Sequence, residues 1–421
     1  MTNQSFKGFV EKLEPWLTGI LLLYFLGLDA PYPIVKLMKV ASYGIIIFLI
    51  LPHWKRFAYV ATRDIPLLLL VTMAILSVLW STSPEVTSIE TKAILRANLF
   101  GVYLATRYSI KEQMQLLAWV LGIGAVLSFV LAIGIPSYGI HLDGEAAGAW
   151  KGIYGFKNLF AANMTVTAVL FLITAFNTRR KRWLSWIMFG LAAVLLFLSK
   201  GKTAYSVFFI SLCLLPLHKF VKQQYKLRVV LLLTTLLLSG SVIVLMLSNL
   251  EFIVVDTLGK NLEFNGRLPI WTLILDKVVE RPWLGYGMSG FWTSDEALYV
   301  LYNSWGAVAL EEGVRFNAHN GYLDLLLSLG VLGVLLYLLI LFRLLTRAVY
   351  LWLSTKNIEF LWIIQYIIII SLLNFADNLA ILGGTLWSIY VSLILSTTIQ
   401  KTRIIKAFQQ SKGLGSIQKY S

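Results

Sequence analysis

The chain has 421 residues, of which 58% are hydrophobic and only 14% are charged. A soluble globular protein carries about 25% charged residues, so this composition argues against a soluble fold. The net charge of +15 does not require a nucleic-acid partner, because Lys and Arg collect in the cytoplasmic loops of membrane proteins. The single cysteine, Cys213, excludes an internal disulfide and a cysteine-based metal site.

Apolar runs recur along the chain, each long enough to cross roughly 30 Å of hydrocarbon. The first run begins at Trp16, after Lys7 and Lys12, and no cleavage signal follows it, so we expect an uncleaved first helix. The runs predict an all-α, polytopic integral membrane protein with about twelve transmembrane helices. The predicted spans are 16–29, 38–52, 65–80, 92–107, 114–135, 158–177, 183–199, 203–218, 229–248, 323–342, 359–375 and 380–399.

The distribution of charge orients these spans. If the N-terminus lies in the cytoplasm, the predicted inside segments together are strongly net positive, and each of them except the neutral segment 1–15 carries net positive charge. The remaining segments together are net acidic. The run Arg179-Arg180-Lys181-Arg182 is the strongest basic anchor. We therefore expect a multi-pass protein of the bacterial inner membrane with both termini in the cytoplasm.

Two segments on the predicted outer side are long. Residues 136–157 are rich in glycine, and residues 249–322 form a large periplasmic loop between the ninth and tenth spans. Long loops between compact elements are usually functional or disordered. The aromatic residues of 249–322 favour a folded loop, with short helices at 267–280 and 294–312. The chain reads as a single membrane domain, 1–421, in which this loop carries the expected active site.

Three apparent motifs carry no cofactor chemistry. Gly285 to Gly290 match G-x-G-x-x-G, but no βαβ unit surrounds them, so a tight turn is the better interpretation. Gly201-Lys202-Thr203 resembles the end of a P-loop, yet the earlier glycine is replaced by Leu196. The four histidines show no metal-ligand spacing. The sequence predicts no bound nucleotide and no metal site.

The second long loop carries three motifs in a fixed order. They are Gly266-Arg267 followed by Trp271, then Pro282-Trp283-Leu284-Gly285-Tyr286-Gly287, then His319-Asn320 followed by Gly330-Val331-Leu332-Gly333. Upstream lie Trp80-Ser81-x-x-Pro84 and the stretch Gly148-Ala149-Trp150-Lys151-Gly152-Ile153-Tyr154-Gly155-Phe156-Lys157-Asn158. This set resembles the signature regions of the O-antigen ligase and polymerase superfamily, which includes exopolysaccharide polymerases.

The chain departs from that family pattern at two positions. Phe156 stands where many relatives have His before Lys-Asn, and Gly201-Lys202-Thr203 stands where many have Ser-Arg-Thr. A lysine at 202 keeps the positive charge but lacks the planar fork with which arginine binds phosphate through two contacts. This departure from the family pattern leaves two roles for Lys202, a replacement for the family arginine or no contact with phosphate.

The resemblance implies a glycosyltransferase whose donor is an oligosaccharide on an undecaprenyl-pyrophosphate carrier in the membrane. The enzyme would transfer the glycan to an acceptor hydroxyl with inversion at the anomeric carbon, without a metal or other cofactor. The stretch 148–158 favours a polymerase of exopolysaccharide or O-antigen repeats. A ligase that transfers the glycan to lipid A-core would use the same donor and remains an alternative.

A polysaccharide transporter or lipid flippase is an alternative from another class. Such proteins place charged residues within their spans along a pathway, and often show repeated halves. Charge in the middle of the predicted spans is nearly absent here, so the sequence favours chemistry at the outer surface.

The proposed chemistry requires a base and fixed cations. His319 titrates near neutrality and is the predicted general base, and Arg267 is the predicted catalytic cation for the leaving pyrophosphate. Asp324 either orients His319 or caps the tenth helix. Other residues predicted to bind pyrophosphate or glycan are Arg96, Lys157, Asn158, Lys202, Arg281, Arg315 and Asn320. For Arg281 and Arg315, ion pairs with nearby glutamates are the competing interpretation, and Asn374 and Asp377 are weaker candidates for an acceptor path.

Overall fold

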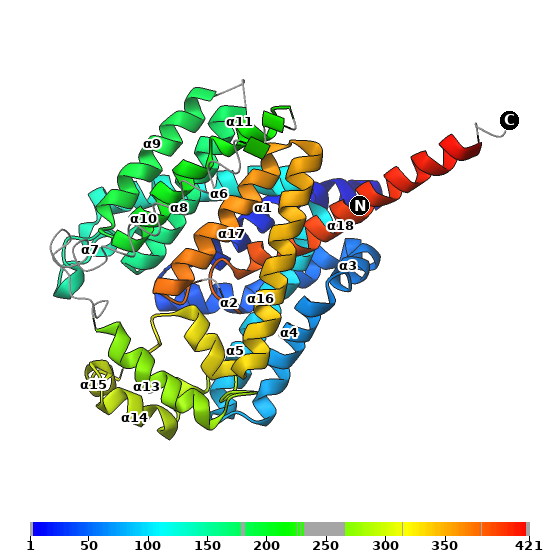
Figure 1. The fold of residues 1–421 in the computed structure, drawn as a ribbon. Coiled ribbons are helices and arrows are strands. Elements are labelled where there is room, and N and C mark those ends of the chain that lie inside the picture. The colour runs from blue at the N-terminus through cyan, green and yellow to red at the C-terminus, as the bar shows by residue number, and fades with distance from the viewer. Residues whose placement is uncertain are drawn as a thin grey trace.

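The computed structural model describes residues 3–417 except 178–181, 225, 228, 231–265, 314 and 380. Nearly all of the expected ninth span, 229–248, and most of the basic run at 179–182 therefore lie outside the described residues. The described chain is all-helical, without a β-strand, and has one isolated bridge between Ile140 and Trp150. The α-helices are α1 Asn3–Phe25, α2 Tyr32–Ile50, α3 Trp54–Ala61, α4 Ile65–Leu76, α5 Pro84–Arg107, α6 Ile110–Gly134, α7 Pro136–Gly139, α8 Lys157–Asn177, α9 Arg182–Leu198, α10 Lys202–Leu214, α11 Leu217–Val221, α13 Arg267–Glu280, α14 Leu298–Tyr302, α15 Gly306–Glu311, α16 Gly321–Thr355, α17 Ile358–Ala376 and α18 Trp387–Ile417 (Figure 1).

Six helical segments in the described chain are long and apolar enough to cross a membrane. They are Tyr32–Ala61, Ile110–Gly134, Lys157–Asn177, Lys202–Val221, Gly321–Thr355 and Ile358–Ala376. Five of them contain a predicted span, and Ile110–Gly134 covers the predicted span 114–135 except for its last residue. Two shorter apolar helical segments, Ile65–Leu79 and Arg182–Leu198, coincide with two further predicted spans. Helices α1, α5 and α18 are long but are not among the six. The total of twelve spans thus remains a prediction.

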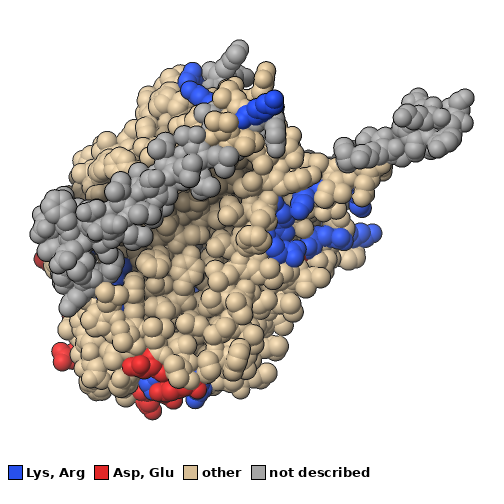
Figure 2. Space-filling view, viewed as in Figure 1, with Lys and Arg blue, Asp and Glu red and all other residues tan. Residues whose placement is uncertain are grey.

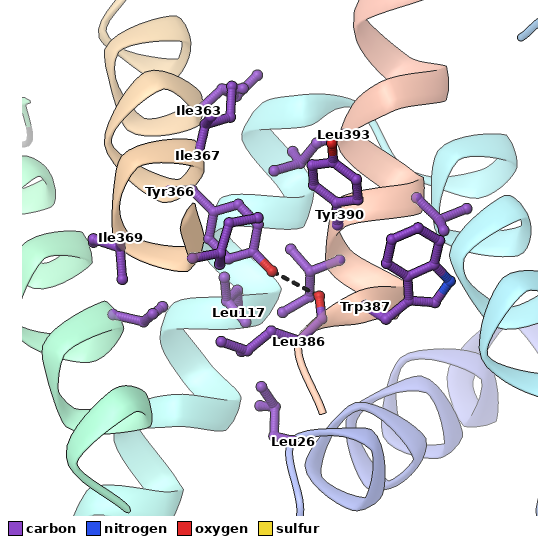
Figure 3. Packing of buried hydrophobic residues seen from close by; sticks show 14 of the residues in the cluster. Leu26, Leu117, Ile363, Tyr366, Ile367, Ile369, Leu386, Trp387, Tyr390 and Leu393 are labelled. Carbon is purple, nitrogen blue, oxygen red and sulfur yellow. Dashed lines mark hydrogen bonds between the residues drawn. The ribbon is translucent and has the colours of Figure 1, made fainter. Parts of the chain in front are cut away.

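The helices pack around a continuous apolar core. Helix α8 packs against α9, α5 packs against α18, and α16 packs against both α17 and α4. Trp362 and Tyr366 of α17 and Trp387 and Tyr390 of α18 are fully buried. The hydroxyl of Tyr366 donates to the carbonyl of Leu386 at 2.7 Å (Figure 3). This bond gives a buried polar group a partner, as a low-dielectric core requires.

The outward faces of several helices are also apolar. On α2 these exposed side chains include Ile34, Leu37, Val40 and Ile47. Such large exposed apolar surfaces are unfavourable in water but match hydrocarbon, because lipid tails are as apolar as leucine. The surface of the bundle is therefore that of a membrane protein.

Charged residues gather at opposite ends of the bundle. Figure 2 shows most visible Asp and Glu along the lower edge, where α13, α14 and α15 lie in Figure 1, and most visible Lys and Arg at the top and right. On the basic side, Glu14 binds Arg107 at 3.0 Å, and buried Asp64 binds Arg347 at 2.7 Å. These pairs tie α1 to α5 and the start of α4 to α16.

The helices of the expected outer loop form a small unit with a core of its own. Helix α13 has the predicted bounds, 267–280, whereas the expected single helix 294–312 is wrong. That stretch is divided into a short 3-10 helix, Asp295–Ala297, followed by α14 and α15. Its buried side chains, with those of α13 and the neighbouring turns, are Ile270, Ile274, Tyr286, Phe291, Trp292, Ala297, Val300, Leu301, Phe316, Ala318 and Leu327.

The glycine motifs interlock where this unit meets α16. Gly330, inside α16, has φ +63° and ψ −167°, which breaks the helix and frees backbone groups. The turn 282–287 satisfies them, since the Val331 amide donates to the Pro282 carbonyl at 2.8 Å and the Tyr286 amide donates to Leu327 at 2.7 Å. A Cβ at Gly330 would lie 2.3 Å from the Trp283 carbonyl, so only glycine fits.

The Trp-Ser-x-x-Pro segment docks on the same turn. The Trp80 indole donates to the Leu284 carbonyl at 3.0 Å, and the Thr82 amide donates to the Tyr286 carbonyl at 3.0 Å. Three sequence motifs that are far apart in the chain thus build one junction. The junction fixes the outer unit against α16, the helix that begins two residues after His319.

Candidate active site

A polar cavity of about 450 Å³ lies beside the outer unit. Its charged lining consists of four basic side chains and one acidic one, namely Lys157, Lys200, Lys202, Arg267 and Asp377. Asn158 also lines it, so four residues predicted from the sequence meet in one space. We call this space the basic cavity. Its excess of positive charge suits an anionic ligand.

Three helices begin at the basic cavity. Lys157, Lys202 and Arg267 are the first residues of α8, α10 and α13 and all line it. Gly201 and Gly266 precede two of these helices and provide no side-chain cap. Helix N-termini attract anions through free amide groups and the helix dipole. The cations and the backbone therefore favour the same kind of ligand.

The rim of the cavity is held by contacts with the loop after α17. Asn158 donates to Asp377 at 2.8 Å, and the Arg267 guanidinium donates to the Ala376 carbonyl. The carboxylate of Asp377 also accepts from the backbone amide of Asn378 at 2.9 Å. The expected span 380–399 is wrong at its start, because α18 begins only at Trp387 and the residues before it form this loop.

His319 lies against an aromatic wall of the outer unit. Its ring centroid is 5.2 Å from that of Trp305 and 5.7 Å from that of Phe316. Its backbone has φ +47°, a strained conformation for a residue with a side chain, and its amide donates to Asn317 at 2.7 Å. The imidazole Nδ1 is buried without a hydrogen-bond partner among the described residues.

The pKa of His319 is set by burial and by two of the charged groups of the cavity, Asp377 and Arg267. Burial lowers the imidazole pKa, Asp377 opposes this, and Arg267 lowers it further. Burial also lowers the pKa of Arg267, which Asp377 opposes, although a guanidinium stays charged at neutral pH. His319 is thus kept neutral near pH 7, which is the form a general base needs.

Asn320 and Asp324 position His319 from either side. The side chain of Asn320 caps α16 by accepting from the amides of Tyr322 and Leu323 at 3.0 and 3.3 Å. Asp324 is buried and accepts from the Ala318 amide at 3.1 Å and the Trp292 indole at 2.8 Å. Asn378 donates to its other oxygen at 3.0 Å. Asp324 therefore joins the His319 segment to the Asp377 loop and does not itself bond the imidazole.

Three predicted cations lie elsewhere. Arg281 lies 3.8 Å from Glu296, and Arg315 binds Glu90 at 2.7 Å. Both arginines are thus near glutamates, but not the neighbours in sequence, Glu280 and Glu312, that the ion-pair interpretation considered. Arg96 lies in a separate cavity between α1, α2 and α5. The structure does not bring these three arginines into the basic cavity.

Two residues at the site gave no useful signal in the sequence. Lys200 lines the basic cavity, and its ammonium donates to the Ala147 carbonyl at 3.1 Å. His141 packs its ring edge-on to Phe156 at 5.4 Å and accepts from the Lys157 amide at 3.3 Å. Burial lowers the pKa of His141, and Lys151 and Lys157 add to the effect. Lys200 stands two residues before Lys202 but belongs to none of the quoted motifs, and His141 lies 16 residues before Lys157, also outside them.

Trp271 connects two parts of the site through a hydrogen bond and a ring contact. Its indole donates to the Ala318 carbonyl at 2.9 Å, and its ring meets Phe375 edge-on at 5.8 Å. It therefore links α13, which begins with Arg267, to the segment before His319.

Comparison with known proteins gives one family. Residues 187–338 match a family model described as O-antigen ligase. The matched segment includes Lys202, Arg267 and His319 together with the interlocking glycine motifs. No curated protein matches the chain.

Proposed function

We propose that this chain, a member of the O-antigen ligase and polymerase family, transfers glycans from a lipid pyrophosphate carrier to an acceptor hydroxyl. The family match indicates a membrane enzyme that acts on glycans. The basic cavity supports the finer proposal, because its cations and three helix N-termini suit a pyrophosphate, and two of its charged residues, Arg267 and Asp377, shift the pKa of His319. The proposed donor is an undecaprenyl-pyrophosphate-linked oligosaccharide.

The proposed transfer uses His319 as the base and the cations of the basic cavity to stabilise the leaving group. The acceptor oxygen forms a bond to the anomeric carbon while its proton passes to neutral His319. The bond from the anomeric carbon to the pyrophosphate oxygen breaks, and its electron pair leaves with the lipid pyrophosphate. Arg267, Lys157, Lys200 and Lys202 stabilise the charge that develops there. Attack opposite the leaving group inverts the anomeric centre, and His319 then releases its proton to water.

The proposal includes the orientation of the protein in the membrane. The acidic edge formed by the outer unit would face the periplasm, and the basic side, with both termini, would face the cytoplasm of a bacterial inner membrane. An alkaline phosphatase fused within the segment 294–312 should be active, and one fused at 355 should be inactive. The opposite pattern would invert the orientation.

Polymerisation of exopolysaccharide or O-antigen repeats is the preferred reaction, on the resemblance carried by residues 148–158. Transfer of a finished glycan to lipid A-core is the second candidate. A deletion strain separates them. Loss of long chains with short chains still attached supports a polymerase, and loss of all attached glycan supports a ligase.

The direct test uses purified protein, a lipid-linked oligosaccharide donor and its acceptor. Wild-type protein should form the longer glycan, and His319→Ala should abolish the product while the protein still inserts at normal levels. Movement of lipid-linked glycan across a bilayer without any joined product would instead support the transporter class.

A further inference from the structure

The cavity that contains Arg96 is a second space of about 440 Å³ at the same end of the bundle. Its lining includes Tyr24, Asp29, Arg96, Tyr154 and Phe156. It adjoins the basic cavity, because Phe156 lines one cavity and Lys157, the next residue, lines the other. The loop between α17 and α18 borders both, through 376–379 on one side and 383–385 on the other. We call this space the Arg96 cavity.

Arg96 is buried with no carboxylate bound to it in the described chain. The residue is 5% exposed, its Nη1 donates to the Lys39 carbonyl at 3.1 Å, and its Nε has no partner among the described residues. Its guanidinium carbon lies 4.9 Å from the ring centroid of Tyr43 and 5.3 Å from that of Tyr24. Aromatic faces attract a cation but do not neutralise it. A buried arginine that lines a cavity and lacks an acidic partner is suited to an anionic ligand.

Further positive charge lies on the exposed surface of the two helices beside Arg96. Lys36, Lys39 and Lys92 are exposed on α2 and α5, the helices that meet at Arg96. The Tyr43 hydroxyl donates to the Lys92 carbonyl at 3.4 Å, which brings these lysine-bearing segments together. Asp29 is the single acidic residue among the described residues of the cavity lining. The face of α2 beside this cluster is apolar and exposed.

We infer that the Arg96 cavity binds the phosphate of a membrane-anchored glycan acceptor, at the same time as the basic cavity binds the donor pyrophosphate. This inference rests on the proposed function, and it specifies the acceptor as an anionic glycolipid. Two adjoining anion sites, each at the same membrane face, allow two lipid-linked substrates to lie side by side. A neutral glycan or a protein acceptor would make no use of the buried guanidinium.

The first test is a binding stoichiometry, which requires no turnover. Detergent-solubilised full-length protein is titrated calorimetrically with geranylgeranyl pyrophosphate, a soluble prenyl pyrophosphate, and with the uncharged alcohol geranylgeraniol as a control. Wild type should bind two molecules of the pyrophosphate per chain. Arg96→Gln should weaken one site roughly tenfold or more, as expected when a charge-assisted contact with phosphate is lost. Arg267→Gln should weaken the other.

Two further variants distinguish a specific loss of binding from a folding defect. Asp29→Asn removes the acidic charge of the cavity and should tighten the site that Arg96→Gln weakens, an opposite effect that misfolding cannot produce. Arg63→Gln is the matched control, because Arg63 also stacks on a tyrosine, with its guanidinium carbon 3.6 Å from the Tyr59 ring centroid, and lies beyond the end of α3. It should leave both sites intact. One site per chain, or two sites insensitive to Arg96→Gln and Asp29→Asn, would overturn the inference.

Two further measurements test whether the phosphate in the Arg96 cavity is carried by a lipid and whether it belongs to the acceptor. Inorganic pyrophosphate should fail to fill the Arg96 cavity at concentrations where the prenyl compound does, and equal binding of both would overturn the lipid-anchored acceptor. In the transfer assay, Arg96→Gln should raise the acceptor KM and leave the donor KM unchanged. A raised donor KM would place Arg96 in the donor site instead. If no variant transfers glycan but the two sites respond as expected, the proposed function fails and the second anion site stands.

Discussion

Asn158 donates a hydrogen bond of 2.8 Å to Asp377, a residue 219 positions later in the chain. The bond joins the start of α8 to the end of α17 across the rim of the basic cavity. It holds Lys157 on one side and the loop that receives Arg267 on the other. The cavity is thus assembled from helix ends whose positions depend on one another.

This bond predicts a graded response at position 158. Asn158→Ala removes the donor, and Asn158→Asp places a second carboxylate against Asp377 and lowers the positive charge of the cavity. We expect inorganic pyrophosphate to inhibit transfer less strongly in both variants, and Asn158→Asp to show the larger loss. Inhibition curves with purified protein measure this order. Stronger inhibition of Asn158→Asp than of wild type would contradict an anion site here.

The pH dependence of transfer should report His319. Its pKa is lowered by burial, so the base remains deprotonated, and active, below the usual histidine value of about 6.5. Activity should therefore fall on acidification through a midpoint below that value. Asp377 raises this pKa, so Asp377→Asn should move the midpoint of kcat/KM to still lower pH. A shift to higher pH in that variant would show that Asp377 does not act on the base.

Asp324 should act through position rather than chemistry. Asp324→Ala leaves the Trp292 indole and the Ala318 amide without their acceptor, at a cost of about 1–3 kcal/mol for each buried group. Asp324→Asn retains an acceptor oxygen and should lose less stability. Thermal unfolding in detergent measures this difference. Transfer by Asp324→Asn should show a lower kcat with the acid midpoint of wild type, since the residue does not touch the imidazole. A displaced midpoint would give Asp324 a direct electrostatic role.

Gly330 should tolerate no side chain. Its φ of +63° costs a non-glycine residue about 1–3 kcal/mol, and the added Cβ would collide with the Trp283 backbone. Gly330→Ala should therefore unfold at a markedly lower temperature and lose transfer activity. Gly44→Ala, in α2, is the control, because a Cβ there meets nothing within 4 Å. Equal stability of the two variants would refute the interlocked turn.

The helical architecture was largely predictable because it depends on the length and apolarity of continuous segments. Six predicted spans and helix 267–280 follow from that local information. The break at 303–305 and the late start of α18 were not predicted. Both arise from tertiary packing, as the outer unit and the Asp377 loop fold against other helices rather than continuing a helical period.

The candidate site was predictable only in part. Lys157, Asn158, Lys202 and Arg267 were identified by motif and meet in one cavity, but the partners of Arg281 and Arg315 were not foreseen. Lys200 stands two residues before Lys202 and was not singled out, whereas His141 reaches the Lys157 amide through the fold, which a linear pattern does not predict. Asp377 was a weak candidate until the geometry placed it beside Asn158.

We propose that Arg267 stabilises a leaving lipid pyrophosphate in the basic cavity. The decisive measurement is the rate at which purified protein releases undecaprenyl pyrophosphate in step with glycan transfer, compared between Arg267→Gln and Arg281→Gln. The two arginines stand at opposite ends of α13, since Arg267 is its first residue and Arg281 follows its last, but Arg267 lines the cavity and Arg281 lies beside Glu296. We predict a loss of about 100-fold or more for Arg267→Gln, in the range found when one stabilising donor is removed, and a rate near wild type for Arg281→Gln. Equal rates in the two variants would contradict this account.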